Sequence, residues 1–327
     1  MSRRFVVSLR LLAFALLAIG APLAPPAHAS CGSESCPLDR ASLWDESRLS
    51  FELAQQYIDQ NQPRVRTDDA SVGAIPAHHD EVRTVNRITT ARAAYRSGQA
   101  WTFSAALPFV NRTHEHIHNH MGVPHYQRWN YAHVGDLEAV ALRHFGGADS
   151  KRSYFISAGF KAPTGVTEVE EVDGDQPEPS ARPGTGSWDV LAGLGAEWRL
   201  GGLAGEPGGV PVRVGVGGRW NARGTENYQV GAELTAYLGT EVPVARAASL
   251  LLQTNLRVRA KDDVGDFHAE EGNTGGTAVY VSPGVKFNVG HRLSFYGLFQ
   301  VPVYQRVNGI QIVSGSNLYF GVSRAIL

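Results

Sequence analysis

The sequence predicts an all-β protein, a transmembrane antiparallel up-and-down β-barrel of about twelve strands. After residue 45, short segments alternate apolar and polar side chains, and turns rich in Gly, Asn and Asp separate them. The connections alternate between short and long, and the clearest segment carries a Trp near each end. A barrel in a bilayer needs an apolar outer face, a polar lumen and aromatic girdles at both interfaces.

The clearest segment runs from residue 187 to residue 200. Successive side chains of a strand point to opposite faces. One face therefore carries Trp188, Val190, Ala192, Leu194, Ala196, Trp198 and Leu200. The other face carries Asp189, Leu191, Gly193, Gly195, Glu197 and Arg199. Charge on one face and two Trp on the other indicate lipid outside and water inside.

Twelve segments are near the nine to eleven residues that a tilted strand needs to cross a bilayer. We expect strands at 47–58, 82–96, 101–113, 131–145, 152–163, 187–200, 209–221, 227–239, 248–261, 277–289, 292–306 and 312–326. The alternation that supports them is clear in the third strand, where Trp101, Phe103, Leu107 and Phe109 face away from Thr102, Ser104 and Ala106. It recurs later, with apolar rows at Val210, Val212, Val214 and Val216, at Tyr228, Val230, Leu234 and Leu238, at Leu250, Leu252, Leu256 and Val258, at Val279, Val281, Val285 and Phe287, and at Leu293, Phe295, Phe299 and Val301.

Long polar connections are expected at 59–81, 114–130, 164–186 and 262–276. Bacterial barrels have short periplasmic turns and longer external loops, so both ends of this barrel are predicted to be periplasmic. A barrel of this size leaves a narrow lumen. The alternative is a soluble β-sandwich or barrel, whose apolar face would point inward.

The N-terminus resembles a secretory signal peptide. Three arginines, at positions 3, 4 and 10, precede a short apolar run, and Ala27-His28-Ala29 forms a small-x-small cleavage site. We therefore expect a signal peptide at 1–29, a periplasmic segment at 30–45 and an outer-membrane barrel at 46–327. The formal net charge of −1 becomes more negative without the signal arginines, which argues against nucleic-acid binding.

The only two cysteines, Cys31 and Cys36, lie at the start of the predicted mature chain. In an oxidising compartment the favoured interpretation is a local disulfide. The alternatives are a thiol pair that binds a soft metal ion and lipidation of Cys31, although His28 stands where a lipidation signal normally has an aliphatic residue.

Five short segments resemble an outer-membrane family labelled "putative MetA-pathway of phenol degradation", whose members are transporter-like barrels. The segments are Val134-Gly135-Asp136-Leu137, Ala162-Pro163-Thr164-Gly165, Gly184-Thr185-Gly186-Ser187-Trp188-Asp189, Val301-Pro302-Val303-Tyr304-Gln305-Arg306-Val307-Asn308-Gly309 and Phe320-Gly321-Val322-Ser323. The resemblance covers roughly residues 80–327 and implies an outer-membrane barrel of transporter type. It does not indicate the substrate. The final Leu327 departs from the Phe or Trp with which such barrels usually end.

A histidine-rich tract is a further candidate metal site. His114, His116, His118 and His120 alternate, and His125 follows, while His78 and His79 lie in the preceding connection. Read as a strand, the four alternate histidines share the lumen side, and a His-x-His pair suits Zn(II), Cu(II) or Ni(II). Histidine-rich tracts commonly bind metal; the alternative is an ordinary polar external loop. No cofactor is required.

The predicted lumen face carries charges of both signs. These are Asp136, Glu138, Asp189, Glu197, Arg199, Arg213, Glu233, Arg257, Arg259 and Lys286. They either form crossed ladders that plug the pore or produce a transverse field. The sequence thus predicts a porin-like channel that passes small solutes passively, with metal capture at the histidine tract. Its expected partners are outer-membrane lipid, the barrel-assembly machinery and a small solute or metal ion.

Two other functions remain open. One is a closed barrel that acts as a metal-binding or structural surface protein. The other is an outer-membrane phospholipase, which would need Ser, His and a carboxylate or amide together on the lipid-facing wall. No such group is evident, since Ser323 has no nearby histidine and Ser294 has only His291. The chain is therefore predicted not to be an enzyme.

Overall fold

The structure, a computed structural model, describes residues 47–75, 80–120, 123–146, 152–201, 209–267, 270–290 and 292–326. The predicted signal peptide at 1–29, the segment at 30–45 and the cysteines Cys31 and Cys36 lie outside these ranges. In the ranges described, no helix has the length and apolar character needed to cross a membrane.

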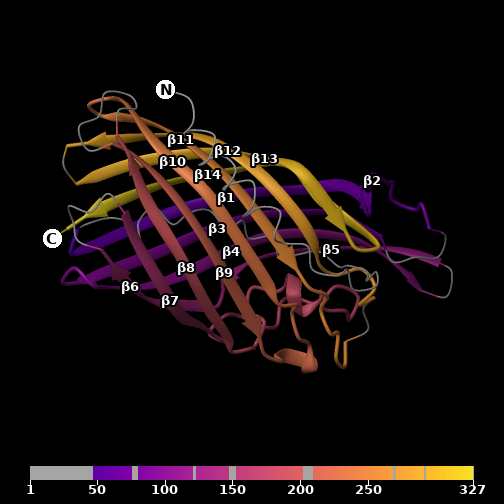
Figure 1. Ribbon diagram of the computed structural model, residues 1–327. Coiled ribbons are helices and arrows are strands. Elements are labelled where there is room, and N and C mark those ends of the chain that lie inside the picture. Colours follow the sequence, from indigo (N-terminus) through magenta and orange to yellow (C-terminus); the bar gives the residue numbers. More distant parts are fainter. Residues whose placement is uncertain are drawn as a thin grey trace, which may run out of the picture.

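Twelve antiparallel strands form a closed barrel, which confirms the predicted fold class (Figure 1). In chain order they are β1 (Leu49–Val65), β3 (Asp80–Ser97), β4 (Trp101–His120), β6 (Leu137–Phe145), β7 (Arg152–Ala162), β8 (Asp189–Leu200), β9 (Val210–Asn221), β10 (Glu233–Ala245), β11 (Ala248–Arg259), β12 (Gly276–Val289), β13 (Leu293–Val307) and β14 (Ile310–Ala325). Each pairs with its neighbours in this order, and β14 pairs with β1 to close the barrel. Two further strands, β2 (Asp68–Asp69) and β5 (Val123–Val134), pair with β1 and β4.

The outer face is apolar and the inner face is polar. Trp188, directly before β8, and Trp220 on β9 are 59% and 73% exposed, and Leu194 midway along β8 is 59% exposed. Inward-facing positions hold buried polar residues such as Asn255 and Gln300. Exposed aromatic side chains lie on the outer face at both ends of the apolar band. At one end they are Tyr95, Trp101, Phe145 and Tyr154, and at the other Tyr57, Phe109, Phe160, Trp188 and Trp220. This is the reverse of a soluble sandwich.

Strands β1, β3, β4 and β5 extend beyond this band as a sheet (Figure 1). The predicted loops at 59–81 and 114–130 were therefore largely wrong, because β4 continues to His120 and β5 returns along it. Polar pairs on the inner face stabilise the extension: Asn86 Nδ2 donates to Gln60 Oε1 at 3.0 Å, and Arg112 Nε donates to Asn86 Oδ1. Such cross-strand contacts keep a polar segment extended.

Two other predicted strands also differ from the structure in their bounds. The strand expected at 131–145 is two strands, β5 and β6, separated at Gly135 and Asp136, because the Asp136 side chain binds groups from other segments. The strand expected at 227–239 begins only at Glu233. Tyr228, expected on the lipid face, is 2% exposed and donates to Asp262 Oδ2 at 2.6 Å.

The connection between β7 and β8, residues 163–188, folds against the inner face of β4 and β5. Val169 packs in an apolar cluster with Val110, Trp129 and Tyr131. The carbonyl oxygen of Ala181 accepts hydrogen bonds from Arg112 Nη1 and the Tyr131 hydroxyl. This connection therefore covers one side of the barrel mouth from which the β4–β5 hairpin projects.

Candidate functional site

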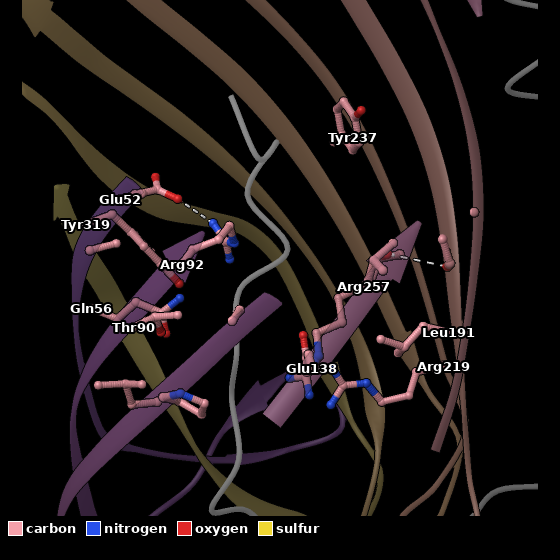
Figure 2. A pocket seen from close by; sticks show the side chains of 18 of the residues that line it. Glu52, Gln56, Thr90, Arg92, Glu138, Leu191, Arg219, Tyr237, Arg257 and Tyr319 are labelled. Carbon is pink, nitrogen blue, oxygen red and sulfur yellow. Dashed lines mark hydrogen bonds and ion pairs between the residues drawn. The ribbon is translucent and has the colours of Figure 1, made fainter. Parts of the chain in front are cut away.

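The barrel encloses a cavity of about 780 Å³ (Figure 2). Ten basic and six acidic side chains of the described residues line it. The basic ones are Arg92, Arg112, Lys161, Arg182, Arg213, Arg219, Arg257, Arg259, Lys286 and Arg292, and the acidic ones are Glu52, Asp136, Glu138, Asp189, Glu233 and Glu241. A charged lining of this kind suits water and polar solutes, and it distinguishes the lumen from a packed core.

Most of the predicted lumen charges lie on this lining. They are Asp136, Glu138, Asp189, Arg213, Glu233, Arg257, Arg259 and Lys286. Glu197 is instead buried in the wall, where its carboxylate accepts from Arg213 Nε at 2.8 Å. Arg199 lies near the end of β8, half exposed, and its Nε is 3.2 Å from Glu197 Oε1.

Ion pairs along the wall join basic and acidic side chains of different strands. Arg92 on β3 contacts Glu52 on β1 at 2.5 Å, and Arg257 on β11 contacts Glu233 on β10 at 2.7 Å. Lys286 on β12 reaches Glu241 on β10 at 3.2 Å. The pairs Arg92–Glu52 and Arg257–Glu233 join neighbouring strands and keep their side chains along the wall, whereas Lys286–Glu241 passes over the one strand between β10 and β12.

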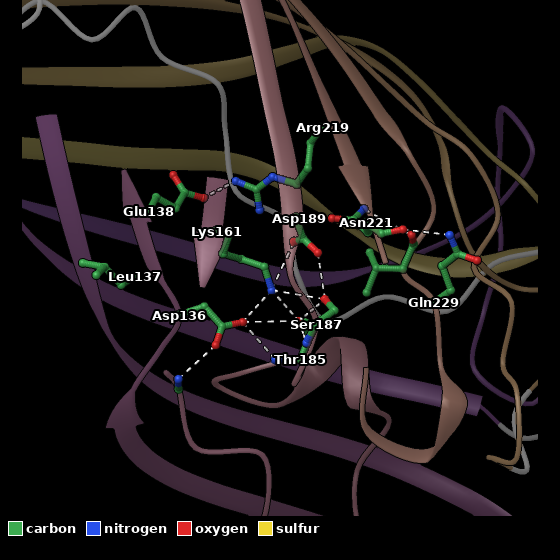
Figure 3. Close-up of polar contacts among 12 residues, drawn as sticks. Asp136, Leu137, Glu138, Lys161, Thr185, Ser187, Asp189, Arg219, Asn221 and Gln229 are labelled. Carbon is green, nitrogen blue, oxygen red and sulfur yellow. Dashed lines mark hydrogen bonds and ion pairs between the residues drawn. The ribbon is translucent and has the colours of Figure 1, made fainter. Parts of the chain in front are cut away.

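One pair spans a wider distance along the wall. Arg219 on β9 contacts Glu138 on β6, so the pair passes over the two strands between them, as Figure 3 shows. Both residues line the cavity. Side chains that bridge non-adjacent strands must project from the wall, so this pair narrows the lumen at its level.

Lys161 lies at the centre of a buried polar network (Figure 3). Its Nζ is 2.6 Å from Asp136 Oδ2 and 3.1 Å from Asp189 Oδ2, and all three side chains are at most 6% exposed. Ser187 Oγ donates to Asp189 Oδ1 at 2.7 Å. Asp136 also accepts from the backbone amides of Gly165 and Thr185, at 2.9 and 3.1 Å. A single buried carboxylate therefore fixes both ends of the β7–β8 connection.

The backbones of Gly135, Gly165 and Gly184 approach one another closely beside Asp136, and this approach requires residues without a side chain. A Cβ on Gly165 would lie 2.8 Å from the Gly184 Cα and 2.7 Å from the Gly135 carbonyl carbon, which leaves no room for a side chain. The backbone of Leu137 adds a hydrogen bond to Thr164 Oγ1 at 2.9 Å. Three of the five sequence segments that carry the family resemblance thus meet at one point, where they anchor the β7–β8 connection to the barrel.

The histidine tract lies on β4, beyond the apolar band, on the face that continues the lumen side. His114 is buried, its Nδ1 is 2.8 Å from Thr84 Oγ1, and its ring stacks on Trp129 at 5.6 Å between centroids. Burial, with electrostatic repulsion from His116 and Arg112, lowers the pKa of His114 to about 3. His114 is therefore neutral at physiological pH and serves the packing of the hairpin.

His116 and His118 are neighbours on the same face, with ring centroids 6.4 Å apart. His118 is directly opposite His125 in the β4–β5 register, and His125 Nε2 is 2.6 Å from Asp173 Oδ2. Within the described ranges, no three His, Cys, Asp or Glu side chains converge closely enough to hold a metal ion. His78, His79 and the side chain of His120 lie outside the described part, so metal binding stays a prediction.

Some residues that line the cavity were not among the lumen charges predicted from the sequence. Lys161, Arg219, Arg92 and Glu52 all contact other lumen residues. A strict reading of alternation would have found them, because each follows or precedes an outward aromatic or aliphatic residue: Phe160, Trp220, Ala91 and Phe51. Their partners on other strands depend on the barrel register, which the sequence does not specify.

Comparison with known proteins identifies the fold of this chain. No family model matches the sequence, and neither does any curated protein. Among solved structures, the COG4313 outer membrane channel from Pseudomonas putida F1 superposes with a TM-score of 0.64 and 13% identity, covering 86% of this chain and 96% of that one. The chain has the fold of an outer-membrane β-barrel. The transport unit of the autotransporter AIDA-I from Escherichia coli is less similar, with a TM-score of 0.49 and 9% identity over 89% of this chain and 94% of that one.

Proposed function

We propose that this protein is an outer-membrane channel through which small polar solutes diffuse passively. The observation that carries the proposal is the cavity of about 780 Å³ inside a closed barrel, lined by charged side chains on inward-facing positions. A purely structural barrel would fill this space with packed side chains, as small barrels do. The likeness in fold to an outer membrane channel agrees with this function.

The outer membrane is the proposed location. The apolar outer band, with aromatic side chains at both ends, matches the depth profile of a bilayer. The predicted signal peptide provides export, and the barrel would then be inserted by the barrel-assembly machinery and surrounded by outer-membrane lipid. Membership of the transporter-like family labelled "putative MetA-pathway of phenol degradation" is part of the same proposal.

The charges of the lumen favour anions. Basic side chains outnumber acidic ones on the lining, ten to six. Arg112 adds a buried cation that donates hydrogen bonds to neutral groups: Asn86, Tyr131 and the Ala181 carbonyl. An excess of positive charge in a low-dielectric pore raises the local concentration of anions. We therefore infer a weak preference for small anionic over cationic solutes.

Single-channel recording of the refolded mature protein in a planar bilayer tests the channel. Discrete conductance steps, with a reversal potential in a KCl gradient that shifts toward the chloride equilibrium potential, support both parts of the proposal. Steps with cation preference would retain the channel and overturn its selectivity. Folded protein without any steps would favour the alternative function, a closed barrel that serves as a metal-binding or structural surface protein.

Metal capture is a second candidate function, favoured by the neighbouring rings of His116 and His118 opposite His125. These three histidines, with His120, would supply imidazole ligands for Zn(II), Cu(II) or Ni(II). Calorimetric titration with each metal tests it. Saturable binding that disappears in the His116→Ala/His118→Ala protein, but persists in His144→Ala, supports capture; unchanged binding in the double variant rejects it.

We propose no enzymatic activity. Ser294 and Ser323, the serines considered for a phospholipase, line the cavity and do not face lipid. Ser294 Oγ donates to Asn288 Oδ1 at 2.7 Å. Hydrolysis of phospholipid by the purified barrel, abolished in Ser294→Ala, would overturn this view.

A further inference from the structure

One register row of the barrel wall places two aromatic residues beside two glycines. Phe155 on β7 is directly paired with Gly195 on β8, Gly195 with Gly215 on β9, and Gly215 with Tyr237 on β10. Directly paired residues of antiparallel strands project to the same side of the sheet. Phe155 and Tyr237 both line the cavity, so the whole row faces the lumen.

The rings occupy the space that the glycines leave empty. A Cβ on Gly215 would lie 2.5 Å from Tyr237 Cε1, 2.7 Å from its Cζ and 2.8 Å from its hydroxyl. A Cβ on Gly195 would collide with Cε1 and Cζ of Phe155 in the same way. Each ring therefore leans sideways over the neighbouring strand and lies along the wall. It does not project toward the centre of the lumen.

The same arrangement occurs at a second place in the barrel. Tyr296 on β13 is directly paired with Gly321 on β14, and a Cβ on Gly321 would lie 2.6 Å from both Cζ and the hydroxyl of Tyr296. The displaced hydroxyl of Tyr296 donates to Glu52 Oε1 at 2.6 Å. Rings packed over cross-strand glycines are a known means of stabilising strands that lack a side chain. Its repetition on inward faces indicates a common effect on the lumen.

We propose that this row, Phe155–Gly195–Gly215–Tyr237, sets the bore of the channel and hence the size limit for solutes. The inference rests on the proposed channel function. An aromatic ring is the largest kind of side chain on the lining, so its direction changes the open cross-section more than that of any smaller neighbour. With glycine opposite, the ring lies on the wall and the passage stays wide. With any side chain opposite, the ring must turn into the lumen.

The decisive variant is Gly215→Ala. The three atoms nearest to its new methyl group all belong to the Tyr237 side chain, so movement of that side chain relieves the closest contacts. We expect single-channel conductance to fall by roughly a factor of two, because conductance follows pore cross-section. The double variant Gly215→Ala/Tyr237→Ala removes the displaced ring and should restore conductance to at least the wild-type value.

Gly217→Ala is the matched control. Gly217 also faces the lumen on β9, two residues away, but a Cβ there would approach only Thr235 Oγ1, at 3.2 Å, and the Ala192 carbonyl oxygen, at 3.7 Å. Its conductance should equal that of the wild type. Equal losses in Gly215→Ala and Gly217→Ala, or no recovery in the double variant, would overturn the proposal.

A crystal structure of the Gly215→Ala protein separates this inference from the channel itself. If wild-type protein fails to conduct, the proposed function fails, and the position of the Tyr237 ring still decides the present inference. A ring turned from the wall into the cavity supports it. A ring that stays over residue 215, with a shift of the β9 backbone instead, rejects it.

Discussion

Glu138 on β6 is joined to Arg219 on β9 across two intervening strands, and both side chains line the cavity. The other ion pairs of the lining that involve predicted lumen charges join residues closer along the wall, such as Arg257 and Glu233 on neighbouring strands. Among these ion pairs, the long pair therefore bridges the most strands of the wall.

Removal of this pair should widen the passage. In Glu138→Ala/Arg219→Ala we expect a larger single-channel conductance, because two side chains that project from the wall are lost together and neither charge is left unpaired. Arg199→Ala, whose side chain is outside the cavity lining, is the control and should conduct like the wild type. A conductance that is unchanged or lower in the double variant would show that the pair lies beside the conducting path.

Lys161 should be essential for the stability of the barrel mouth. In Lys161→Met, Asp136 and Asp189 would lose their shared cation while remaining buried, and breaking a buried pair in this way costs about 3–5 kcal/mol. Urea unfolding in lipid vesicles, followed by the gel mobility of folded barrels, measures the loss. In Lys161→Met/Asp136→Asn/Asp189→Asn most of the stability should return; a triple variant as unstable as the single one would contradict the argument.

The lipid face should reject charge in proportion to depth. Leu194 lies midway along β8 and is 59% exposed on the apolar side. We expect Leu194→Arg to cost about 2–4 kcal/mol, and Leu200→Arg at the strand end only about 0–1 kcal/mol. Equilibrium unfolding in vesicles gives both values. Equal costs at the two positions would mean that the apolar band is placed differently.

Acid should weaken the β4–β5 hairpin through His114. Its pKa of about 3 in the folded protein is below the value of about 6.5 expected in the unfolded chain. The unfolded chain therefore takes up the proton first, so stability falls as pH decreases from about 6.5 to about 3, by at most about 1.4 kcal/mol per unit, and does not fall further below that.

Hydrogen exchange of the β4 and β5 amides across this pH range measures the effect. The groups that contact the His114 ring are Thr84, His116 and Trp129, and Arg112 acts on it through its charge. His114→Gln should flatten the pH profile, whereas the exposed His125→Ala should preserve its slope. Parallel profiles in wild type and His114→Gln would assign the acid sensitivity to other groups.

The sequence predicted the barrel because alternation is a local property. Each strand carries its own apolar face, such as the one that Trp188, directly before β8, forms with Val190 and Leu194 on that strand. The fold class, and the face that most strands turn toward lipid, can therefore be predicted without knowing which strands pair. The bounds were less accurate where side chains have non-local partners. Asp136 interrupts a periodic segment because it binds Lys161 and Gly165, and Tyr228 is buried because Asp262 lies beside it.

The sequence predicts many of the charged residues that line the cavity, but not which of them contact one another. The parity of each strand identified Glu138 and Glu233 as inward-facing, but the pairing of Glu138 with Arg219 depends on how four strands align. The row of Phe155, Gly195, Gly215 and Tyr237 likewise requires three registers at once. An isolated glycine in a strand pattern indicates a close approach of some kind without naming the partner.

The seam between β1 and β14 has a kinetic consequence. Its ladder begins with Ser50 opposite Ala325, so the pairing joins segments separated by almost the entire barrel sequence. Every other pairing of neighbouring barrel strands closes a much shorter stretch of chain, and the entropy of closing a long stretch is unfavourable until other contacts have formed. The seam should therefore form last. An unsealed intermediate would expose two rows of unsatisfied amides and carbonyls to hydrocarbon, so insertion and closure should occur together, and a chain shortened within β14 should accumulate outside the membrane.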